Sequence, residues 1–296
     1  MGRKEKILQY IDKSGLGLEI GPSHRPIAPK KDGYRVQILD HMSREQLMAK
    51  YKEHGVDIDS IEEVDFIWQG ERYLELTGSA KQYEWIIASH VIEHTPDLIG
   101  FLNDCDTVLK DDGVISLAVP DKRYCFDHFR PLAGISTIID GHTQELVDHT
   151  QGTVAEYYLN VVSRSKEIAW ACGAVGDYKF LYSHNEALQK IKQAAEDDAY
   201  VDVHAWCFVP HSFRLMIRDL FDLGFIPFKE VGFHSTEGCE FFITLGRGGA
   251  GCALSRMELL RKIESEEKDM FGLKERLRGF FLRGRSAVRR RVMSRR

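Results

Sequence analysis

The stretch Leu16-Gly17-Leu18-Glu19-Ile20-Gly21-Pro22-Ser23-His24-Arg25 decides how the whole chain is interpreted. Its first half has the pattern of a short buried strand with an acidic residue near the end, and a glycine turn follows. A strand that stops at glycine lets a ligand approach the backbone closely, because no Cβ stands in the way. In open α/β sheets, ligands bind outside the carboxyl ends of the strands. We therefore expect a ligand site beside Glu19 and Gly21.

A second strand, predicted over Tyr34–Leu39, ends on Asp40. A carboxylate at the end of this strand is placed to accept hydrogen bonds from the two hydroxyls of a ribose. Asp40 follows Glu19 by 21 residues, so the two segments together have the layout of a site for a nucleoside-containing cofactor.

The glycines of this region narrow the choice of cofactor. A dinucleotide site needs G-x-G-x-x-G directly after the first strand, so that a pyrophosphate can rest on a helix N-terminus. Here Gly15 and Gly17 fall before or within the strand, and Pro22 stiffens the turn that follows. S-adenosylmethionine (SAM) has no phosphate and needs only a glycine turn beside its methionine part. The predicted SAM contacts in this region are Glu19, Gly21, Pro22, Ser23 and Asp40.

The composition is that of an ordinary globular protein. The 296 residues are 43% apolar and 29% charged, which is enough to build one large domain with insertions or two small ones. Six cysteines occur with no C-x-x-C pair, which favours a reducing compartment. The first 15 residues lack the apolar run of a signal peptide, and no segment approaches 18 apolar residues. We expect a cytoplasmic protein.

Apolar periodicity predicts strands that alternate with helices up to about residue 120, which is typical of a parallel sheet. Strands are predicted over Leu16–Ile20, Tyr34–Leu39, Val64–Trp68, Tyr83–Ser89 and Val114–Val119. Helices are predicted over Lys4–Ile11, from Ser43 to about His54, and over Asp97–Lys110, the last closed by the turn Asp111-Asp112-Gly113. Residues 121–209 have few strand-like runs and are expected to be mostly helical. A helix over Ser212–Leu223 and two strand-like runs, Phe225–Gly232 and Cys239–Leu245, follow.

Two further motifs give the chain a family resemblance. They are Ser89-His90-Val91-Ile92-Glu93-His94 after the fourth strand and Leu109-Lys110-Asp111-Asp112-Gly113 before the fifth. Together with Glu19-Ile20-Gly21 and Asp40, the chain resembles the class I SAM-dependent methyltransferases (methyltransferase type 11-like). The resemblance implies an α/β, Rossmann-like fold with a seven-stranded, mostly parallel sheet whose last two strands form an antiparallel hairpin, and a large, mainly helical insertion after strand five.

This resemblance also implies how the chain is divided. Residues 1–120 are expected to form the SAM-binding half of the methyltransferase domain, and residues 210–250 its C-terminal helix and hairpin. Residues 121–209 are then an insertion that forms the substrate pocket or lid, and residues 251–296 a helical basic tail. The end of strand three is expected to border the adenine, and the residues after strand four to contact SAM. The residues expected there are Trp68, Gln69, Gly70, Ser89 and His90.

The segment His90-Val91-Ile92-Glu93-His94 raises the question of a metal. It fits the spacing of a zinc-protease motif. Such histidines must share one face of a long helix, however, and this segment leaves a strand and meets Pro96. Some class I O-methyltransferases carry Glu-x-x-Glu-His here and bind Mg²⁺. His90 replaces the first Glu, whereas Mg²⁺ prefers oxygen ligands. A divalent metal is therefore an alternative, but a structural role for Glu93 and His94 is favoured.

Methyl transfer to a hydroxyl needs a base close to a poor nucleophile, and water must be excluded. Residues near the predicted strand ends and in the insertion are candidates for this chemistry. The candidate catalytic residues are His90, His94, Asp121, Asp127 and His204. The polar and aromatic candidates for contacts with a hydroxyl-rich substrate are Arg123, Tyr124, Asp127, Arg130 and Trp206.

The run Pro120-Asp121-Lys122-Arg123-Tyr124-Cys125-Phe126-Asp127 is similar to methyltransferases encoded with bacterial surface-polysaccharide (O-antigen) enzymes. The tail Leu273–Arg296 has ten Lys/Arg and one acid, with apolar residues at roughly helical spacing. Such a helix can lie on an anionic membrane surface, whereas its aromatics argue against a nucleic-acid partner.

We therefore predict an O-methyltransferase that acts on a sugar hydroxyl of a polysaccharide or lipid-linked glycan, peripheral to the inner membrane face. The alternatives are a small-molecule O- or N-methyltransferase, for a quinone or a secondary metabolite, and a catalytically idle scaffold. The sequence leaves the oligomeric state open.

Overall fold

The computed structural model describes residues 1–53, 55–196 and 200–270. Its main sheet has the strand order β3-β2-β1-β4-β5-β9-β8. The first five strands are parallel, whereas β9 runs antiparallel to both β5 and β8. The strands are β1 (Leu16–Ile20), β2 (Arg35–Asp40), β3 (Phe66–Ile67), β4 (Tyr83–Ser89), β5 (Leu109–Pro120), β8 (Lys229–Glu237) and β9 (Glu240–Gly246). The predicted Rossmann-like methyltransferase sheet with a terminal antiparallel hairpin is therefore confirmed.

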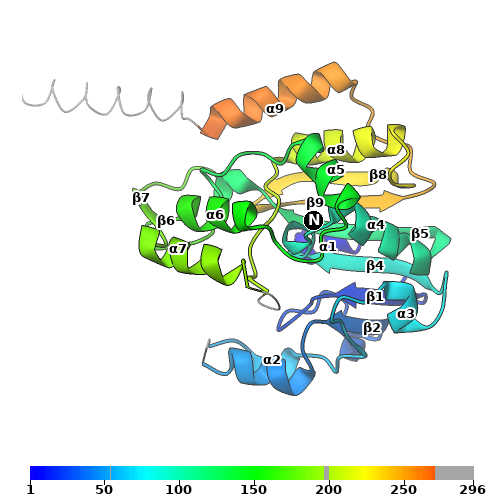
Figure 1. Ribbon diagram of the computed structural model, residues 1–296. Coiled ribbons are helices and arrows are strands. Elements are labelled where there is room, and N and C mark those ends of the chain that lie inside the picture. Colours follow the sequence, from blue (N-terminus) through cyan, green and yellow to red (C-terminus); the bar gives the residue numbers. More distant parts are fainter. Residues whose placement is uncertain (54, 197–199, 271–296) are drawn as a thin grey trace, which may run out of the picture.

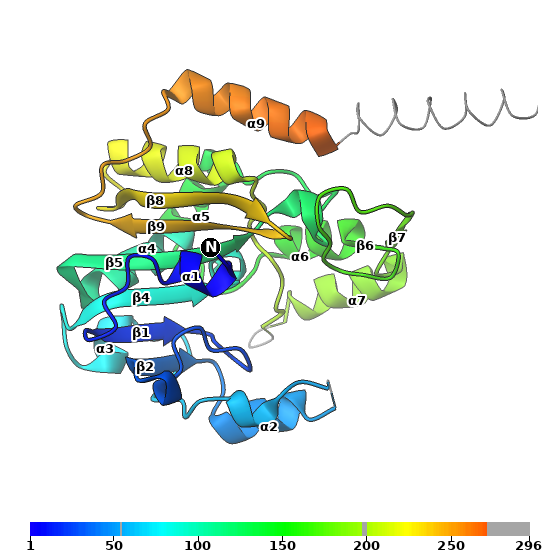
Figure 2. The ribbon, with the colours of Figure 1, turned by 180° about the vertical axis from the view of Figure 1, so that it is seen from behind.

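Helices cover both faces of this sheet. One face is packed against α3 (Tyr73–Thr77), α4 (Leu98–Val108) and α8 (Pro210–Asp222), and the other carries α1 (Arg3–Ile7), as Figures 1 and 2 show from opposite sides. Helix α9 (Arg256–Met270) packs on α8. The remaining short elements before β5 are α2 (Arg44–Tyr51) and the 3₁₀ helices η1 (Lys30–Asp32), η2 (Ile58–Ser60) and η3 (Ile92–His94).

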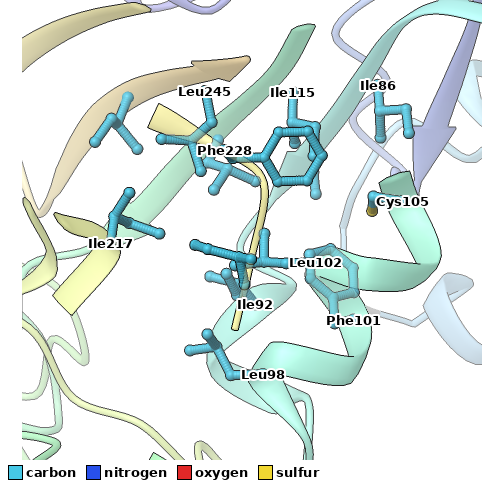
Figure 3. Packing of buried hydrophobic residues seen from close by; sticks show 14 of the residues in the cluster. Ile86, Ile92, Leu98, Phe101, Leu102, Cys105, Ile115, Ile217, Phe228 and Leu245 are labelled. Carbon is cyan, nitrogen blue, oxygen red and sulfur yellow. The ribbon is translucent and has the colours of Figure 1, made fainter. Parts of the chain in front are cut away.

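The larger core lies between the sheet and the α3, α4 and α8 layer (Figure 3). There Ile86 and Ile115 of the central strands meet Leu102 of α4, and all three side chains are fully buried. Burial of an aliphatic side chain of this size contributes about 1.5–3 kcal/mol, so this layer fixes the strands whose ends carry the site. On the opposite face Ile7 of α1 packs with Trp85 of β4 in a smaller core.

Most of the segment 121–209 between β5 and α8 lies beyond the carboxyl ends of the parallel strands (Figures 1 and 2), whereas its residues 135–143 pack on α4. It holds η4 (Lys122–Tyr124), α5 (Ile135–Thr143), α6 (Gln151–Asn160), α7 (His184–Gln193) and a two-stranded sheet of β6 (Val162–Arg164) and β7 (Tyr178–Phe180). Its two ends lie side by side, because the Lys122 N–H donates to the Phe208 carbonyl at 2.9 Å. Val154, Ala187 and Val203 belong to a small core of its own.

Several element boundaries differ from the sequence prediction. The Ser43 cap is confirmed, since its hydroxyl accepts from the Gln46 N–H and the Gln46 side chain accepts from the Ser43 N–H. The turn predicted at 111–113 is wrong, because β5 already begins at Leu109, where this fully buried residue pairs with Tyr83. Sheet pairing here overrides the turn preference of Asp and Gly.

The first of the two predicted C-terminal strands is also displaced. The sequence predicts it over Phe225–Gly232, whereas β8 spans Lys229–Glu237. The predicted amphipathic segment Leu273–Arg296 lies outside the described residues. Of the helices in the described part of the chain, none combines the length and apolar character needed to cross a membrane.

Candidate functional site

The turn after β1 requires glycine. Gly21 has φ of +61°, a left-handed conformation, and its N–H donates to the Leu39 carbonyl of β2 at 2.8 Å. A Cβ built on Gly21 would lie 3.0 Å from Cγ2 of Val91, in the segment after β4. The backbone therefore passes close to the β4 end, at the edge of the sheet where a ligand would approach it.

Glu19 holds the segment that follows this turn. Its side chain is buried, and its two carboxylate oxygens accept the N–H groups of Ile27 at 2.6 Å and Ala28 at 3.0 Å. Burial raises the pKa of Glu19 to about 7, although both N–H groups favour the carboxylate form. The structure thus gives Glu19 a loop-fixing role, and the SAM contact predicted for this side chain stays a prediction.

Asp40 lies at the end of β2, as the ribose hypothesis requires, but it is covered. Its Oδ2 accepts the Ser23 N–H at 3.1 Å, and its Oδ1 accepts the His41 N–H at 2.8 Å. The His41 ring lies against the same oxygen, with Nδ1 at 2.6 Å, and only 1% of the Asp40 side chain is exposed while 49% of His41 is. Each Asp40 oxygen keeps spare acceptor capacity, and the ribose contact predicted for this side chain stays a prediction.

The residues after β3 form a tight turn beside Asp40. The Trp68 N–H donates to the Asp40 carbonyl at 2.9 Å, and the Trp68 indole donates to the Glu71 carbonyl at 2.8 Å. Gly70 has φ of +109°, and the Gln69 N–H is bound by the Glu71 carboxylate. Trp68 is 36% exposed, so an apolar surface is available next to Asp40, where the adenine contact is predicted.

His90 belongs to a charged network at the end of β4. Its Nε2 lies 2.9 Å from Oε2 of Glu240, and Arg3 of the N-terminal helix binds both Glu240 and the Ser89 hydroxyl. Burial opposes a charge on His90, but the Glu240 hydrogen bond and the neighbouring Glu93 outweigh it and raise the pKa of His90. Burial likewise opposes the Glu240 carboxylate, yet His90 and Arg3 lower the pKa of Glu240 to about 2.

A second network joins the insertion to the segment before α8. His204 Nδ1 donates to Oδ2 of Asp127 at 2.6 Å, and Arg130 Nη1 donates to Oδ1 of the same carboxylate at 2.8 Å. All three side chains are buried. Burial alone would favour the neutral acid, but His204 and Arg130 together lower the pKa of Asp127 well below its ordinary value. Asp127 therefore stays ionised and fixes the orientation of the His204 ring.

His94 lies beside His204 and has its own carboxylate. The two rings are 4.6 Å apart edge to face, and His94 Nδ1 donates to Oδ1 of Asp202 at 2.8 Å. This hydrogen bond to His94 lowers the pKa of Asp202 to about 2. Of the predicted catalytic residues, the fold thus brings His94, His204 and Asp127 together, and it leaves His90 in the neighbouring Glu240 network.

Other predicted residues have structural partners. Asp121 binds Arg123 through both oxygens and accepts the Thr236 hydroxyl at 2.6 Å. The Trp206 indole donates to the Thr95 carbonyl at 2.6 Å. Burial of the Tyr124 hydroxyl, together with a smaller effect of its hydrogen bond with Cys172, raises the pKa of Tyr124 to about 12. Catalytic and substrate roles for these residues, and for Arg130, stay predictions.

Four residues of these networks escaped the sequence analysis: Arg3, His41, Asp202 and Glu240. His41 follows Asp40 directly, so its position could have suggested a cover for the carboxylate. Arg3 and Glu240 lie 237 residues apart and Asp202 lies 108 residues from His94, and no local pattern joins them.

Comparison with known proteins identifies the family. A model described as "Methyltransferase domain" matches residues 3–176, more than half of the chain. No curated protein sequence matches significantly. Among solved structures, a SAM-dependent methyltransferase from Mesorhizobium loti aligns at 11% identity and TM-score 0.40, over 82% of this chain and 98% of that one.

A second solved structure is the 1,6-didemethyltoxoflavin-N1-methyltransferase of Burkholderia thailandensis, which aligns at 10% identity and TM-score 0.41 over 82% and 75% of the two chains. Likenesses of this strength carry no argument about substrates, so the family match decides. The chain belongs to the methyltransferase-domain family and is, as the sequence predicted, a SAM-dependent methyltransferase.

Proposed function

We propose that this enzyme transfers the methyl group of SAM to a hydroxyl oxygen, and that the hydroxyl belongs to a sugar in a polysaccharide or lipid-linked glycan. The observation that carries the first part is the cluster of oriented histidines and buried carboxylates built around Asp127 and His204. A hydroxyl is a poor nucleophile and must lose its proton, so an acceptor of this kind needs groups within reach that take the proton or hold a cation that lowers the pKa of the hydroxyl.

The residues at the strand ends fit the cofactor. Gly21 keeps the turn open, because a Cβ at this position would lie 3.0 Å from Cγ2 of Val91. Asp40 has spare acceptor capacity for a ribose hydroxyl. SAM supplies the electrophilic methyl group when it is bound. In this arrangement Gly21 and Ser23 would border the methionine part, Asp40 the ribose, and Trp68 the adenine.

The insertion supports a carbohydrate acceptor. It carries exposed aromatic side chains, Phe129 at 47%, Phe180 at 67% and Tyr200 at 51% exposure. Rings of this kind offer a flat apolar face beside polar groups, which suits a molecule with both CH faces and hydroxyls. The basic segment 273–296 adds support for an acceptor carried on a lipid, since clustered Lys/Arg bind anionic membrane surfaces.

The direct test is incubation with deuterium-labelled SAM and a panel of acceptors, followed by mass spectrometry of the products. The panel contains nucleotide sugars, polyprenyl-linked oligosaccharides, and small catechols and quinols. A labelled methyl on a sugar oxygen supports the proposal. Exclusive labelling of a small aromatic compound or of a nitrogen overturns it, and SAM binding without turnover on any acceptor favours the scaffold alternative.

A further inference from the structure

Three potential metal ligands meet at the edge of the sheet. Glu93 and His94 lie in η3 after β4, and His204 lies in the segment that returns from the insertion; one ligand atom from each lies within 4.8 Å of the others. The two segments are fastened together, because the Ala205 N–H donates to the Glu93 carbonyl at 2.6 Å. The backbone thus keeps the two segments that carry these side chains together.

The Glu93 carboxylate is buried without a hydrogen bond. The residue is 1% exposed, and neither carboxylate oxygen makes a hydrogen bond to any residue that the structure describes. The nearest ring nitrogens, Nδ1 of His90 at 3.5 Å and Nε2 of His204 at 3.9 Å, are too distant for strong hydrogen bonds to Oε1. A buried carboxylate is costly unless it is paired or binds a metal, so this site is arranged for a cation.

Both histidines are oriented as metal ligands are. In each ring Nδ1 donates to a carboxylate, to Asp127 from His204 at 2.6 Å and to Asp202 from His94 at 2.8 Å. This arrangement leaves Nε2 as the ring nitrogen with a lone pair, and a carboxylate behind the ring makes that nitrogen a better donor to a metal. Asp127 is in turn fixed by Arg130, so the outer residues are themselves ordered.

From this geometry we infer that Glu93, His94 and His204 bind one divalent transition-metal ion, and that the acceptor hydroxyl coordinates the same ion. Two imidazole nitrogens and one carboxylate oxygen suit Zn²⁺, Mn²⁺ or Fe²⁺, whereas Mg²⁺ prefers an all-oxygen set. Three protein ligands leave coordination positions open, as in catalytic rather than structural sites. His94 keeps 34% of its side chain exposed, so the cluster is reachable from one side.

The distances are close to those of an occupied site. Ligand atoms about 2.1 Å from one ion lie about 3.0–3.5 Å from each other. The Glu93 Oε1 to His204 Nε2 distance is 3.9 Å, and the three ligand atoms lie within 4.8 Å of one another, so the side chains must draw closer together around one ion.

The role of the ion follows from the proposed O-methylation, on which this inference rests. A hydroxyl that coordinates a divalent cation has a lowered pKa and loses its proton to solvent water near neutral pH. Its oxygen then forms the new bond to the methyl carbon while the carbon–sulfur bond of the sulfonium breaks. The electron pair stays on sulfur, and the products are the methyl ether, neutral S-adenosylhomocysteine and one released proton.

Metal binding is tested on the full chain after removal of bound ions with a chelator. Calorimetric titration with ZnCl₂ and MnCl₂ is expected to give one site per chain, and the Co²⁺-loaded chain is expected to show the visible absorption of a nitrogen-ligated ion. Glu93→Gln, His94→Gln and His204→Gln should each weaken the affinity at least about tenfold, and Asp202→Asn, which changes a positioning residue, about 10- to 100-fold. The control His184→Gln, an exposed histidine at the start of α7, should bind as the unmodified chain does.

Absence of a stoichiometric site in the unmodified chain overturns the inference, and so does unchanged affinity in the Glu93 and His204 variants. If the buried-residue variants fail to fold, the variants at His94 and Asp202, both partly exposed, decide the question by the same titration. SAM binding is measured in parallel on the stripped chain. If the chain methylates a sugar but binds no ion, the metal inference is overturned and the proposed function stands. If it binds an ion but methylates no hydroxyl, the proposed function is overturned.

Discussion

Arg3 Nε lies 2.6 Å from Oε1 of Glu240, so helix α1 is joined to β9, the last strand along the chain, across 237 residues of sequence. Glu240 also binds Nε2 of His90 at the end of β4. The N-terminal helix therefore contributes directly to the charge balance at the edge where ligands are expected.

The first prediction concerns this charge balance. Glu240→Gln should lower the pKa of His90, because the side chain that raises it becomes neutral. NMR titration of the His90 ring measures the change, and Glu237→Gln, an exposed neighbour on the same hairpin, serves as the control. An unchanged His90 titration would show that burial and Glu93 alone set its pKa.

The sign of the accompanying stability change is fixed by linkage. His90 has a folded-state pKa above its unfolded value of 6.5, so its stabilising contribution is complete below pH 6.5 and is lost as the pH rises through the folded value. Glu240 has its pKa lowered from 4.5 to about 2, so its contribution is present above pH 4.5 and is lost toward pH 2. The stability gap between the unmodified chain and Glu240→Gln should thus be largest between pH 4.5 and 6.5.

A second prediction concerns the ribose contact. Asp40→Ala should weaken SAM binding at least about tenfold, which corresponds to about 1.4 kcal/mol and to the loss of a charged hydrogen bond. His41→Ala should bind SAM no more weakly than the unmodified chain, because His41 covers Asp40 and must turn away. Calorimetry of both variants tests this, and equal affinity of Asp40→Ala and the unmodified chain contradicts the ribose assignment.

A third prediction concerns the buried Asp127. Asp127→Asn should destabilise the fold by about 3 kcal/mol, because it leaves the fully buried Arg130 charge with less compensation. The same change frees the His204 ring and should reduce methyl transfer. Denaturant unfolding measures the first effect, with Asp140→Asn on the exposed side of α5 as the control. A loss of stability within about 0.5 kcal/mol of the control would contradict it.

A fourth prediction concerns the close contact of β1 with β4. A Cβ on Gly17 would lie 2.2 Å from the fully buried Trp85 ring, so Gly17→Ala should cost about 1–3 kcal/mol or more. Gly134→Ala, where the nearest atom to a new Cβ is 3.7 Å away, should change stability by about 0.5 kcal/mol or less. Similar unfolding midpoints for the two variants would show that Trp85 can move aside.

The fold could be predicted from the sequence where local signals agree with the global arrangement. β4 spans Tyr83–Ser89, as predicted, because a strand buried on both faces is a continuous apolar run. The Ser43 capping box is likewise local. The beginning of β5 at Leu109 was not predictable from Asp111-Asp112-Gly113, because pairing with Tyr83 decides it.

The candidate site also contains residues that local sequence predicts and residues that depend on long-range contacts. Gly21 and Asp40 stand at strand ends, so their position follows from the strand pattern. The pairing of His204 with Asp127 depends on how an insertion folds back across 77 residues, and Asp202 reaches His94 by the same return. Four members of this network were already candidates from the sequence, each considered separately: His94, Asp127, Arg130 and His204. Their mutual orientation, and the lack of a hydrogen bond to the Glu93 carboxylate, needed the three-dimensional structure.

The adjacent ends of segment 121–209, joined where Lys122 meets the Phe208 carbonyl, have a consequence for acceptor choice. Part of this segment has a small core of its own, whereas Ile138 of α5 belongs to the larger core beside the sheet. If the segment selects the acceptor, as we expect, residues of its small core can change while the strands that carry the predicted SAM contacts keep their packing.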